Sequence, residues 1–179
     1  MQAYHTLTQT TDTSTVVYNV EVEPSYFVDP ARLDIMCRYL YVKSKDENTK
    51  HLHYKEIYKE CIKAQTQGVE PTDKYIKDQT PKNSIQDYID SFDLLIKSFK
   101  TEGYNKAYPI YSNSVKTING GAHRIACSLY YNQRIPTVIS KDTQPKFRLL
   151  NREWFETEGF SEQVILEWEE TLDKLSGSR

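Results

Sequence analysis

The sequence lacks the features that mark membrane and secreted proteins. No apolar run among its 179 residues approaches the roughly 20 residues that a membrane-spanning helix needs. Residues 1–15 are rich in threonine and carry neither the basic region nor the apolar region of a signal peptide. We therefore expect a cytoplasmic protein without a membrane span, and a flexible N-terminus over residues 1–15.

Cysteine is also scarce, and its spacing excludes the usual metal sites. Cys37, Cys61 and Cys127 stand far apart, and no CxxC pair or Cys/His cluster has the spacing of metal ligands. We expect three free thiols in a reducing compartment, with Cys127 packed in the core. His51, His53 and Glu56 lack HExxH spacing, which favours surface polar groups over a metal site. We predict no metal ligands from the protein itself.

A surplus of basic residues is absent as well. Lys and Arg total 23 against 25 Asp and Glu, which gives a net charge of −2. Broad, charge-driven binding to nucleic acid needs a basic face, so we expect no nucleic-acid partner, although a local basic patch stays compatible with this balance. The phosphate loops GxGxxG and GxxxxGK[ST] do not occur either, so neither a Rossmann nor a Walker loop is indicated.

The residues that are present suit one folded domain over 16–179. Hydrophobic residues make up 38% and charged residues 27% of the chain, which is polar but foldable. Residues 16–22 are rich in β-branched and aromatic side chains and predict a strand that ends at Pro24. Asp29 and Pro30 predict the start of a helix of about three turns, with Asp29 as N-cap.

Further elements follow from periodicity and capping signals. Ser84 with Asp87 resembles a capping pair, and Ser161 is a candidate N-cap after Phe160. The chain predicts a loop at 44–50, a helix at 53–65, a connector at 67–82, a helix from 84 to an αL cap at Gly103, strands at 108–111 and 115–118, a helix around 125–130, a strand at 135–139 and a C-terminal helix at 161–175.

The stretch Asn119-Gly120-Gly121-Ala122-His123-Arg124 carries the clearest chemical signal. A strand that runs through a glycine turn into a helix leaves backbone N–H groups unpaired, and with the helix dipole these form an anion site. His123 and Arg124 fall in the first helical turn, where the dipole disfavours a cation unless an anion neutralises it. This pattern predicts a phosphate-bearing ligand, such as a nucleotide. The alternative is an ordinary Asn-Gly-Gly turn with two solvated basic residues.

The string INGGAHRIACSLYYNQRIPTVI, residues 118–139, resembles the box of the ParB/sulfiredoxin superfamily: strand, x-G-x-H/R-R, helix with small residues, and x-I-P-V-x-V. Residues 94–98, Gly103 and Pro109-Ile110 are similar to the family's "helix, S-I, G, P-I" run, and Val20–Pro24 to its first strand. The resemblance implies an α/β (α+β) fold: a small mixed sheet with a ParB/sulfiredoxin-like core, an inserted helical region at about 29–83 and the C-terminal helix.

The resemblance also narrows the chemistry. Sulfiredoxins need a cysteine immediately before the His-Arg pair, and Ala122 stands there, which excludes reduction of sulfinic acids. ParB partition proteins carry a helix-turn-helix domain and a basic surface, and neither is evident here. The remaining branch contains ATP- or ADP-dependent small-molecule kinases, including free-serine kinases. The chain resembles this branch most.

The implied function is an ATP-dependent phosphotransferase that acts on a hydroxyl of a small metabolite or sugar, with Mg²⁺ alongside the nucleotide. Residues 119–124 are expected to hold the phosphates. The catalytic base is expected among Glu21, Glu23, Asp34 and His123, and Arg32 is expected to grip an anionic group of the substrate; each carboxylate has the alternative of being a solvated surface acid.

Two other functions stay open at this point. The first is a ParB-like, DNA-associated module, either a nuclease or a nucleotide-gated clamp. It would need one basic band formed by Lys97, Lys100, Lys106 and Lys116. The second is a catalytically silent nucleotide sensor that docks on a partner.

Overall fold

The computed structural model describes residues 17–66, 82, 84–118, 120–141 and 149–177. Within these ranges the chain forms three strands, six α-helices and one short 3-10 helix. This confirms the expected mixed α+β class with a small mixed sheet. Of the predicted elements, the N-terminal residues 1–15, nearly all of the connector 67–82 and the site residue Asn119 lie outside the described residues.

The sheet joins strands from distant parts of the chain. Its strands are β1 (Val17–Val22), β2 (Ile110–Asn113) and β3 (Ile135–Ser140), in the order β1-β3-β2. Strand β1 runs antiparallel to β3, with Val20 opposite Thr137, and β2 runs parallel to β3, with Ile110 opposite the same Thr137. Ile110 and Thr137 are buried, so this face of the sheet meets the core.

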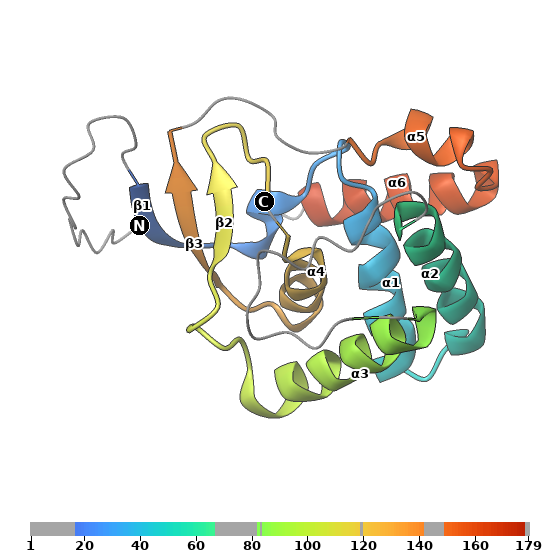
Figure 1. Cartoon of the computed structure of the whole chain (residues 1–179), viewed down its shortest axis with the longest axis horizontal. Helices are drawn as coiled ribbons and strands as arrows, with labels where there is room; N and C mark the ends of the chain where they lie inside the picture. The colour runs from blue at the N-terminus through green and yellow to red at the C-terminus, as the bar shows by residue number, and fades with distance from the viewer. Residues whose placement is uncertain (1–16, 67–81, 83, 119, 142–148, 178–179) are drawn as a thin grey trace.

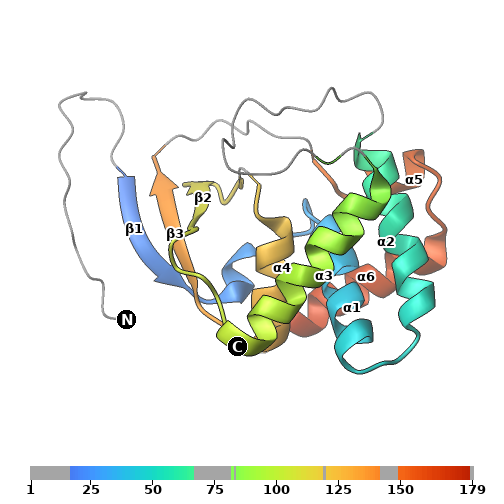
Figure 2. The same cartoon turned by 60° about the horizontal axis from the view of Figure 1, so that its bottom comes forward.

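Helix α4 (Ala122–Tyr131) is at the centre of the molecule. It packs against α1 (Asp34–Asp46), α3 (Ile85–Glu102) and the 3-10 helix η1 (Pro24–Phe27), and it buries Ile125, Ala126 and Cys127. Figure 1 shows α4 between the sheet and α1, and Figure 2 shows α3 crossing in front of both helices. The start of α4 is therefore surrounded by several elements.

The remaining helices cover the far side of α1. Helix α2 (His51–Thr66) and helix α6 (Glu162–Ser176) pack on α1, and the short α5 (Arg152–Thr157) packs on α6 (Figure 1). Side chains cap three of the helix starts: Ser84 and Asp87 form a capping box at α3, Asn151 caps α5 and Ser161 caps α6. In the described residues no helix is both long and apolar enough to cross a membrane.

The first predicted helix starts later than expected. The Asp29 side chain accepts a hydrogen bond from the Ala31 amide at 2.8 Å, but the chain then makes a turn, and α1 begins only at Asp34. The cause is non-local: the Leu33 amide donates to the carbonyl of Leu150 at 2.9 Å, and the Leu150 amide donates to Ala31 at 3.0 Å. This pairing with a distant segment holds residues 31–33 out of the helix.

The strand predicted at 115–118 is wrong, because Asn113 turns the chain there. Its side chain accepts hydrogen bonds from the amides of Val115 and Thr117, and Lys116 adopts φ 62°. Ile118 keeps a single antiparallel bridge to Ser112. Smaller differences are that α1 extends to Asp46 into the predicted loop, that Gly103 has φ 79° and ψ −164° rather than an αL geometry, and that α5 lies in a stretch predicted to be a polar link.

Candidate functional site

The turn before α4 needs both of its glycines, for different reasons. Gly120 and Gly121 have φ values of 75° and 90°, which residues with a side chain rarely adopt. A Cβ atom on Gly121 would lie 2.3 Å from Cδ1 of Ile110, whereas one on Gly120 would have nothing within 4 Å. Gly121 is also the N-cap of α4 and supplies no side-chain hydrogen bond. The turn thus packs closely on β2 and leaves Gly120 open.

A buried ion pair lies beside this turn. Arg38 and Asp34, both on α1, are 4% and 1% exposed, and Nη1 of Arg38 lies 2.9 Å from Oδ2 of Asp34. Arg32 binds the same carboxylate with two hydrogen bonds, of 2.7 and 2.9 Å. Burial acts to raise the pKa of Asp34, but the hydrogen bonds and charge of Arg32 and the charge of Arg38 outweigh it and leave the pKa lowered. Asp34 is therefore an ionised carboxylate between two guanidinium groups.

Arg38 links this ion pair to α4 and α2. Its Nε donates to Nε2 of His123 at 3.3 Å, and its Nη2 donates to Gln65 at 3.0 Å. The hydroxyl of Tyr58 lies 2.7 Å from the same Nε2. Burial, followed by the charges of Arg38, Lys82 and Arg124, holds the pKa of His123 well below its ordinary value of 6.5. The imidazole is therefore neutral at pH 7.

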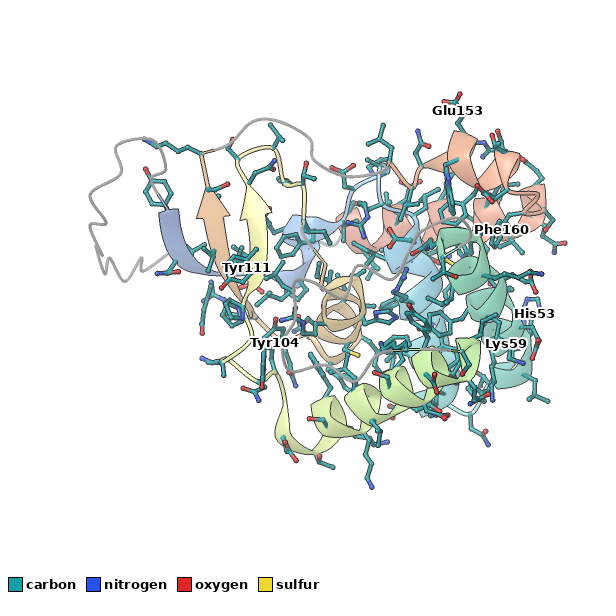
Figure 3. All side chains as sticks on the ribbon, in the orientation of Figure 1. His53, Lys59, Tyr104, Tyr111, Glu153 and Phe160 are labelled. Carbon is teal, nitrogen blue, oxygen red and sulfur yellow. The ribbon has the colours of Figure 1, made fainter. Side chains whose placement is uncertain are left out.

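Two further cations complete the site. Lys82 is partly buried and lies over the ring of Tyr88, 4.7 Å from its centroid, and burial together with Arg38 lowers its pKa. Arg124 donates to three uncharged oxygens: the Tyr108 carbonyl, the Pro109 carbonyl at 3.3 Å and the Tyr104 hydroxyl at 3.4 Å. Figure 3 shows Tyr104 between α4 and the segment that leads into β2. Neither Lys82 nor Arg124 forms an ion pair within the described part of the chain.

We define the basic cluster as four cations: Arg38, Lys82 and Arg124, whose charges act on His123, and Arg32, which joins through Asp34. The charges of this cluster do not balance. Among the described residues, Asp34 is the one carboxylate that forms ion pairs with these four cations. The charge of Asp87 also acts on Lys82, so four cations stand against two carboxylates. The excess of positive charge stands out in a chain whose net charge is −2. Such a cluster attracts an anion, and guanidinium groups suit phosphate.

The structure brings together some of the predicted site residues and separates others. Gly120, Gly121, Ala122, His123 and Arg124 form the start of α4, and Arg38 joins Asp34, and with it Arg32, to His123.

Glu21 and Glu23 lie elsewhere. Glu21 pairs with Lys106 at 2.6 Å, and this hydrogen bond lowers its pKa; Glu23 pairs with Arg134 at 3.1 Å. Arg134 follows the C-terminal end of α4, whereas His123 is in its first turn, and ten helical residues separate the ends by about 15 Å. Neither glutamate joins the basic cluster.

Sequence reasoning missed four residues of the site, namely Arg38, Tyr58, Gln65 and Lys82. Arg38 follows Asp34 at the i, i+4 spacing that favours ion pairs on a helix, and this signal was available. Tyr58 belongs to the apolar stripe of α2, and its polar hydroxyl gave no sign of its partner. Lys82 falls in a charge-rich connector where nothing distinguishes it from its neighbours.

A groove in the described part of the chain lies outside this cluster. It has a volume of about 620 Å³ and runs between α1 and α3. Its charged side chains neutralise one another, since Lys45 pairs with Asp93, and Lys100 pairs with Asp46 at 2.6 Å. The groove therefore has no surplus charge for an anion, and we assign the site to the start of α4.

The other candidate constellations are dispersed. His53 lies on α2 at the edge of the molecule away from α4, and Glu56 pairs with Lys59 (Figure 3). No group of three or more His, Cys, Asp or Glu side chains gathers for a metal ion in the described ranges. Of the lysines considered for a basic band, Lys100 and Lys106 pair with carboxylates and Lys116 lies over the ring of Tyr26. Cys37, Cys61 and Cys127 are buried free thiols.

Comparison with known proteins adds no family to this picture. No protein-family model matches the chain, and neither a curated protein nor a solved structure matches it. The resemblance of residues 118–139 to the ParB/sulfiredoxin box therefore stays a prediction.

Proposed function

We propose that this protein is an ATP-dependent phosphotransferase that acts on a hydroxyl of a small metabolite or sugar. The observation that carries the proposal is the basic cluster at a helix start without a side-chain cap. Arg32 and Arg38 share one carboxylate there, Lys82 and Arg124 add positive charge, and the glycine turn leaves room for a ligand to approach the backbone. Phosphate groups combine the charge and the acceptor geometry that these donors fit.

The phosphates of ATP, or of ADP as an alternative donor, would contact the amides of residues 120–124, with Lys82 and Arg124 supplying charge. Helix dipole and basic side chains then act on the same anion. A protein Mg²⁺ site does not fit the described residues, because the single carboxylate of the cluster, Asp34, is already held by two arginines. Mg²⁺ would therefore arrive as part of the nucleotide complex.

The acceptor would lie on the α1 side of the cluster. Arg32 uses Nε and Nη2 for Asp34, is 20% exposed and keeps Nη1 uncommitted to that carboxylate, so it suits an anionic group of the acceptor. In the reaction the acceptor oxygen forms a bond to the terminal phosphorus, the bond to the leaving diphosphate breaks, and the hydroxyl proton passes to a base. Asp34, expected from the sequence as a base, does not suit this role, because it is buried and both of its oxygens are held by Arg32 and Arg38; it orients Arg32 instead, and the proton passes to water. Glu23 pairs with Arg134 at the opposite end of α4.

The proposal is tested by incubating the protein with ATP, Mg²⁺ and a panel of hydroxyl-bearing metabolites and sugars, with mass spectrometry of the products. We expect equal amounts of ADP and of one phosphorylated acceptor. Asp34→Asn, which removes the carboxylate that holds Arg32 and Arg38, should lower the rate by at least about tenfold, while Glu23→Gln should leave it within about twofold. If nucleotide binding is undetectable at millimolar ATP, the proposal is wrong. Tight binding without turnover on any acceptor would instead identify a nucleotide sensor.

A further inference from the structure

The hydrogen bonds to His123 determine which of its nitrogens carries the proton. Nε2 receives the Nε–H of Arg38 at 3.3 Å, and the hydroxyl of Tyr58 lies 2.7 Å from the same atom. Arginine has donors but no acceptor, so Nε2 must present its lone pair to Arg38. Tyr58 then also donates, because a nitrogen without hydrogen offers it nothing to accept. The proton of the neutral ring is therefore assigned to Nδ1.

The surroundings of His123 keep the ring neutral. Arg38 of α1, Lys82 and Arg124 of α4 are the charged groups that act on it, and all three are cations. The ring of Phe92 from α3 packs edge-on at 4.5 Å between centroids. Burial raises the pKa of Tyr58, which keeps its hydroxyl protonated and able to donate. No hydrogen bond to Nδ1 occurs among the described residues, so this N–H is available to a ligand.

We propose that His123 donates a neutral Nδ1–H hydrogen bond to an anionic oxygen of the ligand, and that Tyr58 and Arg38 are positioning residues that fix this tautomer. The identity of the ligand rests on the proposed function, whereas the tautomer does not. Tyr58 and Arg38 belong to α2 and α1, so the helical region that precedes residues 118–139 becomes part of the ligand site. These helices help His123 to present a neutral N–H donor, whose hydrogen bond does not depend on protonation of the ring.

The tautomer is tested on the whole protein by nitrogen NMR of its histidine rings at pH 7. We expect one ring with a protonated Nδ1 and a bare Nε2, and this signal should disappear in His123→Asn. Tyr58→Phe should shift it toward a mixture of tautomers, whereas Tyr54→Phe, at a tyrosine of the same helix that binds Glu167, should leave it unchanged. An Nε2–H tautomer or an imidazolium in the wild type would overturn the proposal.

The ligand contact is tested by comparing His123→Asn with His123→Gln, using MgADP as the probe in calorimetry. The asparagine amide lies near the position of Nδ1, and the glutamine amide reaches the position of Nε2. We expect His123→Asn to bind within about threefold of the wild type and His123→Gln to lose about tenfold or more, as expected for one hydrogen bond to a charged group. The reverse order would overturn the contact. Thermal unfolding of both variants verifies that they are folded.

These two tests separate the possible failures. If the wild type binds no MgADP, the proposed function fails and the ligand contact fails with it. The NMR spectrum still decides the tautomer and the positioning roles in that case, because it needs no ligand.

Discussion

Helices α3 and α4 begin with opposite chemistry. At α3 the Ser84 side chain accepts from the Asp87 amide at 3.2 Å, and the Asp87 side chain accepts from the Ser84 amide at 2.9 Å. An acid in the first turn also suits the helix dipole. At α4 a glycine replaces the capping side chain, and His123 and Arg124 occupy the first turn. The start of α3 is complete by itself, whereas that of α4 leaves donors and positive charge for a ligand.

Arg38 and Arg152 differ in the same way. Arg152, where α5 meets α6, forms ion pairs with Glu156, Glu162 and Glu169. Arg38 shares its single carboxylate with Arg32. The charge of Arg152 is thus neutralised at the contact between α5 and α6, whereas positive charge stays in excess beside α4. The predictions below test this contrast, from the largest expected effect to the smallest.

Removal of Arg38 should have the largest effect on stability. Arg38→Met leaves the buried carboxylate of Asp34 with only Arg32, and we expect the free energy of unfolding in urea to fall by about 3–5 kcal/mol. The exposed pair of Lys100 and Asp46 is the matched control, and Lys100→Met should cost at most about 1 kcal/mol. The double variant Asp34→Asn/Arg38→Met should recover part of the loss. A smaller loss of unfolding free energy than in the control would contradict a buried ion pair between Arg38 and Asp34.

The two glycines before α4 should differ in their tolerance of a side chain. Gly121→Ala places Cβ against Ile110 at a positive φ, and we expect a loss of about 2–4 kcal/mol in the free energy of unfolding. Gly120→Ala has the same backbone strain but open space, and should lose about 1–2 kcal/mol. Equal losses of unfolding free energy in urea would show that the close contact of Gly121 with β2 does not affect stability.

The pH dependence of stability should reveal the neutral histidine. Folding lowers the pKa of His123, so as the pH falls below about 6.5 the imidazole binds a proton in the unfolded chain but not in the folded protein. This difference destabilises the folded protein. The contribution is complete above pH 6.5 and is lost toward the lower folded pKa, with a slope of at most about 1.4 kcal/mol per pH unit. Unfolding measured at pH 7, 6 and 5 should show this slope in the wild type and in His53→Asn, but a shallower one in His123→Asn. Identical profiles for all three would contradict the lowered pKa.

The cap of α3 should matter for stability alone. Ser84→Ala removes one half of the capping box and should cost about 1 kcal/mol in the free energy of unfolding. The affinity for MgADP should stay within about twofold of the wild type, because α3 does not supply the anion site. An affinity loss as large as that of His123→Gln would show that the two helix starts do not act separately.

Local signals carried much of the sequence-based prediction. The glycine turn, the strand after α4 and the caps of α3 and α6 each depend on a few neighbouring residues, and the structure has them close to the predicted positions. The position of Glu23 outside the basic cluster could not be predicted in this way, since its pairing with Arg134 is a contact between distant parts of the chain.

Non-local contacts account for what the sequence could not show. The start of α1 is set by pairing with Leu150, more than 100 residues away, and no local rule contains that partner. The contacts of Tyr58 and Arg38 with His123 likewise depend on how α1 and α2 pack around α4. Asp34 lies beside the start of α4 through Arg38, and the i, i+4 spacing of these two residues was a usable signal in the sequence. Only the packing shows that Arg32 shares the same carboxylate.

The most direct measurement is a titration of the isotope-labelled protein with MgATP, followed through its backbone amide resonances. The account predicts the largest shifts at residues 120–124, at the start of α4, and none at residues 84–87, at the start of α3. Shifts confined to the groove between α1 and α3, or no shift at millimolar nucleotide, would contradict it.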